Sequence, residues 1–175
     1  MKKQQGSVSM IVVVAAAVVI VLGAGYWAWH RHHHGVIVEP AVGVCDPAHL
    51  QLSKGTSDGT AGTIYTHAVI TNKGTTACSL AGYAAAFLLD AHGMVLGSGA
   101  ASNALYAPVA LIVSPGHSVH TVLGFPDAGN FSAGACTDTS TSLQLFLPGS
   151  IAAITTAWAD HYCPGFSATA LQDGA

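Results

Sequence analysis

Histidines and cysteines are the residues of this chain whose types and spacing could most readily support chemistry. The segment "YWAWHRHHHG", residues 26–35, contains four histidines, His30, His32, His33 and His34. Neutral imidazoles bind Zn, Cu and Ni, so these four residues are candidates for metal binding. Neighbouring histidines on a flexible stretch have neither a fixed geometry nor hydrogen-bonded supports, however, and metal binding is therefore the secondary interpretation.

The four cysteines predict disulfide formation. They are Cys45, Cys78, Cys136 and Cys163, and none belongs to a C-x-x-C pair of the kind that binds zinc or exchanges thiols. An even number of cysteines in a segment expected outside the cytoplasm favours two disulfides, for which three pairings exist. We prefer Cys45 with Cys78 and Cys136 with Cys163, because each bridge then closes one contiguous segment. The alternative, a free nucleophilic cysteine, would require a lowered thiol pKa.

Residue types suited to catalysis occur without a supporting motif. No serine elbow is expected, because the one G-x-S-x-G sequence, residues 55–59, precedes an expected strand and not the helix that such an elbow requires. A blue-copper site needs a histidine and a methionine soon after its cysteine, and the four residues after Cys163 include neither. His117 and His120 form an H-x-x-H motif, but residues three apart on a strand face opposite sides. We therefore expect no enzymatic activity and no cofactor, and we interpret six histidines as surface or satisfied strand residues: His49, His67, His92, His117, His120 and His161.

A long apolar run near the N-terminus predicts where the rest of the chain is located. Residues 10–29 carry no charge and match the ~20 residues that span a bilayer as a helix. Lys2 and Lys3 precede the run, which predicts a cytoplasmic N-terminus over residues 1–9 and a single transmembrane helix or uncleaved signal anchor over residues 10–29. The remainder of the chain is then expected outside the cytoplasm.

The aromatic residues of "YWAWHRHHHG" fit the outer end of this span. Tyr26, Trp27 and Trp29 have the amphipathic rings that are typical of a membrane interface. A cleaved secretory signal is the competing interpretation, but bulky rings stand where small residues would precede the cleavage site. A pilin-like leader, cut after Gly6, is a further alternative. Its resemblance to type IV prepilins is weak, because Ile11 stands where those proteins carry glutamate.

Beyond the span, residues 30–44 are expected to form a His-rich juxtamembrane tether, in which Pro40 disfavours helix. Residues 45–175 are expected to form one domain, in which short apolar segments alternate with turns rich in Asn, Asp, Pro and Gly. This pattern predicts an all-β fold, an immunoglobulin-like β-sandwich, although Trp158 comes too late for the core spacing of a true immunoglobulin domain. The expected strands are Leu50–Ser53, Thr63–Asn72, Ala85–Asp90, Met94–Gly97, Pro108–Val113, Ser118–Phe125, Ser142–Leu147, Ile151–Ala157 and Phe166–Leu171.

Five segments of this domain form a pattern together with the four cysteines. They are "CDPAHLQL", "GTAGTIYTHAVITNKGTTACSLAGY", "VALIVSPGHSV", "CTDTSTSLQLFLP" and "YCPGFSATAL". Over about residues 45–171 this pattern resembles the domain-of-unknown-function family numbered 4232, a family of bacterial extracytoplasmic domains with four cysteines. The most specific part of the resemblance is the set Gly62, Thr63, Tyr65, Asn72, Gly74, Cys78, Leu80, Gly82 and Tyr83.

The chain departs from the family pattern at two places. Ala84 stands where the family usually has proline, and the membrane helix stands where many members carry a lipoprotein signal. The resemblance implies a secreted or membrane-anchored bacterial surface domain with a β-sandwich fold. It implies no activity.

Charge narrows the class of partner. From Gly35 onward the chain has two lysines against one glutamate and seven aspartates, a formal charge of −6. Nucleic acid is disfavoured as a partner, since binding phosphate requires a basic surface.

Taken together, these features lead us to expect a single-pass protein of the cell membrane. Its extracytoplasmic domain is expected to be a binding or structural module for a protein or a cell-wall glycan. The alternatives are a metal- or pH-responsive protein that uses His30 and His32–His34, and a pilin-like surface component.

Overall fold

The computed structural model describes residues 42–136 and 138–175. The expected cytoplasmic N-terminus (residues 1–9), the expected membrane span (10–29) and most of the expected tether lie outside the described residues. Within residues 42–136 and 138–175, no helix combines the length and the apolar character needed to cross a membrane. Val42–Ala175 form one compact unit.

The compact unit begins slightly before Cys45. Val44 forms a parallel bridge with Ser79, and the backbone N–H of Ser79 donates to the carbonyl of Gly43 over 2.8 Å. The last residues of the expected tether, 42–44, therefore belong to the domain.

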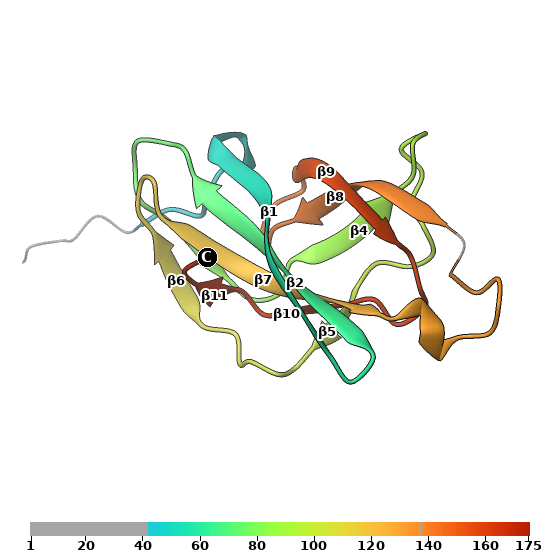
Figure 1. The fold of residues 1–175 in the computed structure, drawn as a ribbon. Coiled ribbons are helices and arrows are strands. Elements are labelled where there is room, and N and C mark those ends of the chain that lie inside the picture. Colours follow the sequence, from blue (N-terminus) through green and yellow to red (C-terminus); the bar gives the residue numbers. More distant parts are fainter. Residues whose placement is uncertain (1–41, 137) are drawn as a thin grey trace, which may run out of the picture. The chain divides into compact units, whose positions relative to one another are not determined.

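The larger sheet is built around two long antiparallel strands, β2 (Thr63–Asn72) and β7 (Ser118–Pro126), which pair from Thr63 with Pro126 to Thr71 with Ser118. Side chains of β2 alternate between a core face, which includes Ala68 and Ile70, and an outer face. The other strands of this sheet are β1 (Leu50–Thr60), β5 (Ala101–Asn103), β10 (Ser167–Thr169) and β11 (Gln172–Asp173), in the order β1-β2-β7-β10-β5 with β11 beside β7. Figure 1 shows β2 and β7 crossing the middle of the domain.

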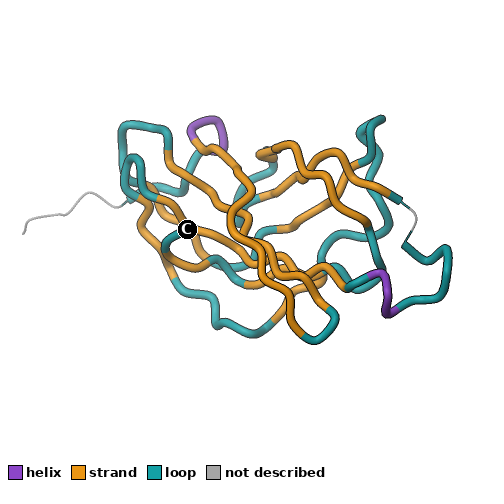
Figure 2. Tube along the Cα trace, in the orientation of Figure 1, coloured by secondary structure: helices purple, strands orange, loops and turns teal. Residues whose placement is uncertain are grey.

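A second sheet and a short ribbon complete the domain (Figure 2). The second sheet is antiparallel, in the order β4-β8-β9, and the ribbon pairs β3 with β6. Single turns of 3-10 helix, η1 and η2, are the only helices among the described residues. The bounds are β3 (Cys78–Ala81), β4 (Ala85–Leu89), β6 (Ala110–Val113), β8 (Thr139–Phe146), β9 (Ala153–His161), η1 (Pro47–His49) and η2 (Ala128–Asn130).

One hydrophobic core lies between the sheets. Ile70 and Leu123 enter it from the larger sheet, and Leu88 and Leu143 from the second sheet, all completely buried. Trp158 on β9 is buried in the same cluster and stacks on Phe125, with ring centroids 6.2 Å apart. The prediction of an all-β fold is confirmed, and the arrangement of the sheets is consistent with a β-sandwich.

The expected strands agree with the structure where the apolar alternation is long. β2 has the expected bounds, and β7 extends one residue beyond them. The expected strand Met94–Gly97 is wrong, because Asp90 binds the backbone N–H groups of His92 and Met94 and folds this segment into a turn. Only Val95 makes a bridge there, with Leu89.

Candidate functional site

All four cysteines form disulfides. Cys45, just before η1, is bonded to Cys78 at the start of β3, and Cys136 is bonded to Cys163 after β9. In each bridge the Cα atoms are 4.7 Å apart. This is the pairing that the sequence analysis preferred, and it leaves no cysteine available as a free nucleophile.

The candidate metal-binding cluster, His30 and His32–His34, lies outside the described residues. The six other histidines are spread over the domain, from His49 in η1 to His161 at the end of β9. The part of the chain that the structure describes contains no group of three or more His, Cys, Asp or Glu side chains able to hold a metal ion.

Two of these histidines are brought together by the pairing of β2 with β7. His67 lies opposite Val122 and His120 lies opposite Val69, so the two histidines are diagonal neighbours on the outer face of the larger sheet. Their rings are stacked, with centroids 4.4 Å apart and planes 6° from parallel. The sequence analysis considered His120 with His117 and missed His67, because 53 residues separate the two partners and only the strand register joins them.

The two imidazoles have different surroundings. Nδ1 of His120 lies 3.1 Å from the carbonyl oxygen of Gly174, and since a carbonyl only accepts, this ring nitrogen is the donor. Nδ1 of His67 is buried without a hydrogen-bond partner. Burial lowers the pKa of His67 below its ordinary value, and the neighbouring His120 lowers it further, while Asp58 acts in the opposite direction.

This geometry is poorly suited to binding a metal. Parallel stacked rings do not direct two lone pairs toward one ion, so His67 and His120 are poor joint ligands. Burial and the neighbouring His120 both lower the pKa of His67 and so favour its neutral form.

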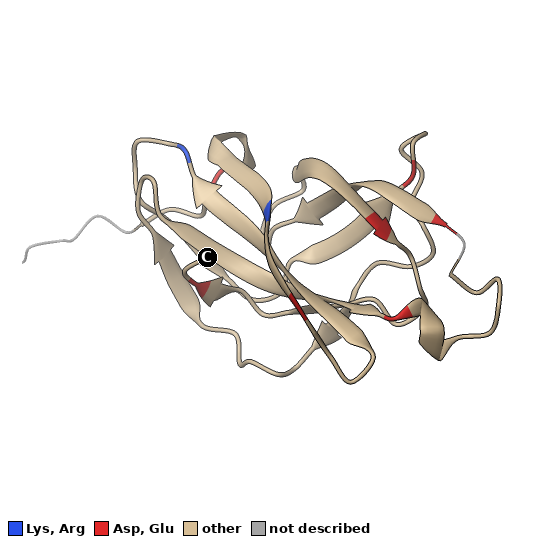
Figure 3. Cartoon of the chain, viewed as in Figure 1, with Lys and Arg blue, Asp and Glu red and all other residues tan. Residues whose placement is uncertain are grey.

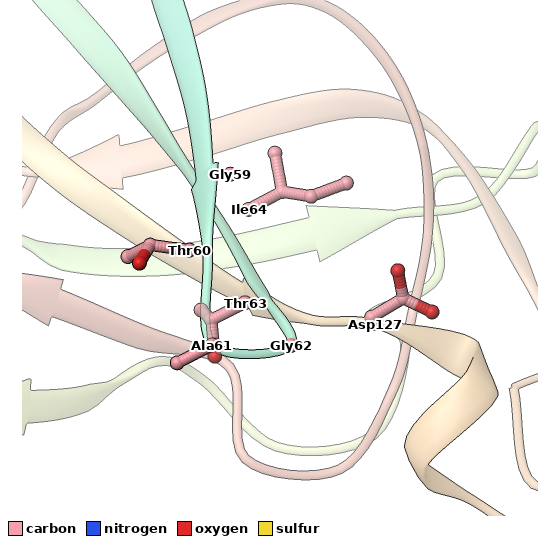
Figure 4. Close-up of a pocket in the computed structure, with 7 residues that line it drawn as sticks. All are labelled: Gly59, Thr60, Ala61, Gly62, Thr63, Ile64 and Asp127. Carbon is pink, nitrogen blue, oxygen red and sulfur yellow. The ribbon is translucent and has the colours of Figure 1, made fainter.

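A shallow hollow lies at the tip of the β1–β2 hairpin (Figure 4). Ala61 and Gly62 form its two-residue turn with φ of +47° and +76°, the left-handed pair that a tight hairpin requires. The carbonyl of Gly62 accepts from the backbone N–H of Asp127 over 2.8 Å and from Nδ2 of Asn130 over 2.6 Å, which fixes the tip against η2. The hollow has a volume of about 240 Å³ and is lined by Gly59, Thr60, Ala61, Gly62, Thr63, Ile64 and Asp127.

The lining of the hollow is suited to hydrogen bonding. Thr60 and Thr63 bring hydroxyl groups, and Asp127 brings a carboxylate, one oxygen of which already accepts from the backbone N–H of Gly129 over 2.7 Å. Such a site can hold a small polar group, and its lining includes no histidine, cysteine, lysine or arginine. The sequence analysis did not identify it, since its only signal is the turn sequence "TAGT".

Comparison with known proteins places the domain in a family. No curated protein and no solved structure matches the chain. A family model described as Domain of unknown function (DUF4232) matches residues 45–172, which include both disulfides, both stacked histidines and the hairpin hollow. The match covers most of the chain, and this chain therefore belongs to the DUF4232 family.

Proposed function

We propose that this chain is a membrane-tethered, extracytoplasmic binding or structural module of the cell surface, with an immunoglobulin-like β-sandwich as its external domain. The observation that carries the proposal is the pair of disulfides, Cys45–Cys78 and Cys136–Cys163. Disulfides form and persist in oxidising compartments and are rare in the cytoplasm. The uncharged run over residues 10–29, preceded by Lys2 and Lys3, supplies a tether with the matching orientation.

The exposed polar groups support a protein or a cell-wall glycan as the partner. The hollow at the β1–β2 tip offers hydroxyl groups and a carboxylate, which are groups that bind sugar hydroxyls or backbone amides. The scarcity of positive charge argues against nucleic acid as the partner. Residues 42–136 and 138–175 contain two lysines, Lys54 and Lys73, no arginine and seven aspartates. The proposal includes no catalytic activity, because the sequence analysis finds no supported catalytic motif.

The tether is tested by the mass and the location of the mature chain. Membranes from cells that express the full chain would be washed with alkaline carbonate, and the retained protein would be measured by intact mass spectrometry. The account predicts retention in the membrane with residues 1–175 uncleaved apart from any loss of Met1. Release of a soluble chain that begins near residue 30 would indicate a cleaved signal, and a chain that begins at Ser7 would indicate the pilin-like alternative.

A further inference from the structure

The β3–β6 ribbon has an outer face that is apolar although it is exposed to solvent. Ser79 lies opposite Ile112 and Ala81 lies opposite Ala110, and these four side chains point away from the core residue Leu80. The bridge between Val44 and Ser79 adds Val44 to the same face. Neighbouring strands are ~4.8 Å apart, so Val44 and Ile112 lie about 10 Å apart on either side of Ser79. We call Val44, Ser79, Ala81, Ala110 and Ile112 the ribbon face.

The ribbon face is unusual in both exposure and charge. Val44 is 64% exposed and Ile112 is 55% exposed, whereas the outer side of a solvated ribbon normally carries polar residues. None of residues 42–44, 78–81 and 110–113 is charged. In Figure 3 no segment coloured for an acidic or basic residue lies on β6. The β8–β9 turn extends this apolar region, because a Cβ on Gly149 would lie 3.9 Å from Val44, and Ile151 in that turn is 99% exposed.

One residue of the ribbon face, Val44, lies close in the sequence to the expected membrane span. The described chain begins at Val42, two residues before Val44 of this face, and residues 30–41 separate Val42 from Trp29 at the end of the apolar run. Twelve residues reach at most about 40 Å even when fully extended. If residues 10–29 span a membrane, as proposed above, the connection keeps the ribbon face within about 40 Å of the end of the span, within reach of the lipid surface.

From these observations we infer that the ribbon face docks on the surface of the same membrane that holds the anchor, with a lipid bilayer as its partner. This inference rests on the proposed membrane tether. Val44, Ile112 and Ile151 enter the boundary between headgroups and acyl chains, where apolar side chains are favoured. β6 pairs only with β3 among the described strands, so its free edge still needs water for its backbone groups. The ribbon therefore rests at headgroup depth and does not enter the hydrocarbon.

The inference is tested by photocrosslinking in vesicles of phosphatidylcholine. The full chain would carry p-benzoylphenylalanine in place of Ile112 or, as the matched control, in place of Met94, which is 66% exposed in the loop after β4. β6 and the start of the described chain lie at one end of the domain and the loop after β4 at the other (Figure 1). Adducts with lipid would be measured by mass spectrometry after flotation of the vesicles.

Docking predicts about ten times more lipid adduct from the probe at position 112 than from the probe at position 94. Adding Val44→Asp should lower the adduct at position 112 about tenfold, since burial of an aliphatic side chain is worth roughly one to two powers of ten. Met94→Asp should leave the adduct at position 112 unchanged.

The outcomes separate docking from the tether. A chain that floats with the vesicles but gives equal adducts from both probes retains its tether and overturns the docking. A chain that fails to float overturns the tether and the docking together. Crosslinked dimers in place of lipid adducts would overturn the docking in favour of a second copy of the chain.

Discussion

At the scale of single residues, the stacked pair His67 and His120 is the contact with the clearest consequence for stability, because the pKa of His67 is lowered there. Nδ1 of His67 is buried without a hydrogen-bond partner, while Nδ1 of His120 donates to the carbonyl of Gly174, just after β11. Burial and the neighbouring imidazole both lower the pKa of His67. The folded domain therefore resists protonation at this residue more than the unfolded chain does.

Acidification is predicted to destabilise the domain through His67. In the unfolded chain His67 takes up a proton near its ordinary pKa of ~6.5, and in the folded domain it does so only at lower pH. The contribution of His67 to stability is thus complete above about pH 6.5 and is lost as the pH falls below that value toward the folded pKa. Urea unfolding at a series of pH values should show a weaker decline for His67→Gln, and His117→Gln serves as the control outside the pair. An unchanged decline in His67→Gln would contradict this assignment.

At the scale of elements, the sequence predicts well those strands whose side chains alternate over many residues. Thr63–Asn72 and Ser118–Phe125 are long enough for one face to be apolar throughout, and that property depends on the strand alone. The sequence does not predict β5 and β11, which are only three and two residues long. Each is a strand only because it pairs with a neighbour, β5 with β10 and β11 with β7. The second half of β1 is rich in Gly, Ser and Thr, and its pairing with β2 determines its conformation.

The candidate sites depend on contacts between segments that are distant in the sequence. The preferred disulfide pairing could be chosen from the order of the cysteines. The stacking of His67 on His120 requires the register of β2 against β7, and the hollow requires η2 to contact the β1–β2 tip. No local sequence pattern predicts the histidine stack or the hollow, so both are seen only in the folded domain.

The β1–β2 turn provides a prediction at this scale. Gly62 has a φ of +76°, and a Cβ there would lie 3.1 Å from Cγ of Asn130, so Gly62→Ala should lower the free energy of unfolding by roughly 1–2 kcal/mol. Gly59→Ala is the matched control, because a Cβ on Gly59 meets nothing within 4 Å. Thermal unfolding of both variants measures the difference. Equal melting temperatures would show that the tip does not require its left-handed conformation.

At the scale of the whole molecule, the two disulfides and the uncharged ribbon face describe a domain suited to the outside of a membrane. The bonded cysteines are separated by 33 residues in one bridge and by 27 in the other, so each bridge restricts the conformations of the unfolded chain. The domain is acidic, and its ribbon face is free of charge. Both features support the proposed extracytoplasmic location and the proposed docking on lipid.

Loss of either bridge is predicted to destabilise the whole domain. The chain-entropy relation gives about 3.5 kcal/mol of stabilisation for each closed segment. The free energy of unfolding should fall by roughly that much in each of two double variants, Cys45→Ser with Cys78→Ser and Cys136→Ser with Cys163→Ser. Urea unfolding of each double variant beside the oxidised parent measures the loss, with reduced parent as a second reference. Unchanged stability in both variants would mean that the bridges contribute nothing to the fold.

The positions of the lysines allow the most direct test of the central claim, that the domain lies outside the cytoplasm on a membrane tether. Lys2 and Lys3 precede the apolar run, and Lys54 and Lys73 are the only lysines after it. A membrane-impermeant amine reagent applied to intact cells, followed by peptide mass spectrometry, should modify the exposed Lys73 and leave Lys2 and Lys3 unmodified until the cells are lysed. Protection of Lys73 on intact cells, together with its modification after lysis, would contradict the account.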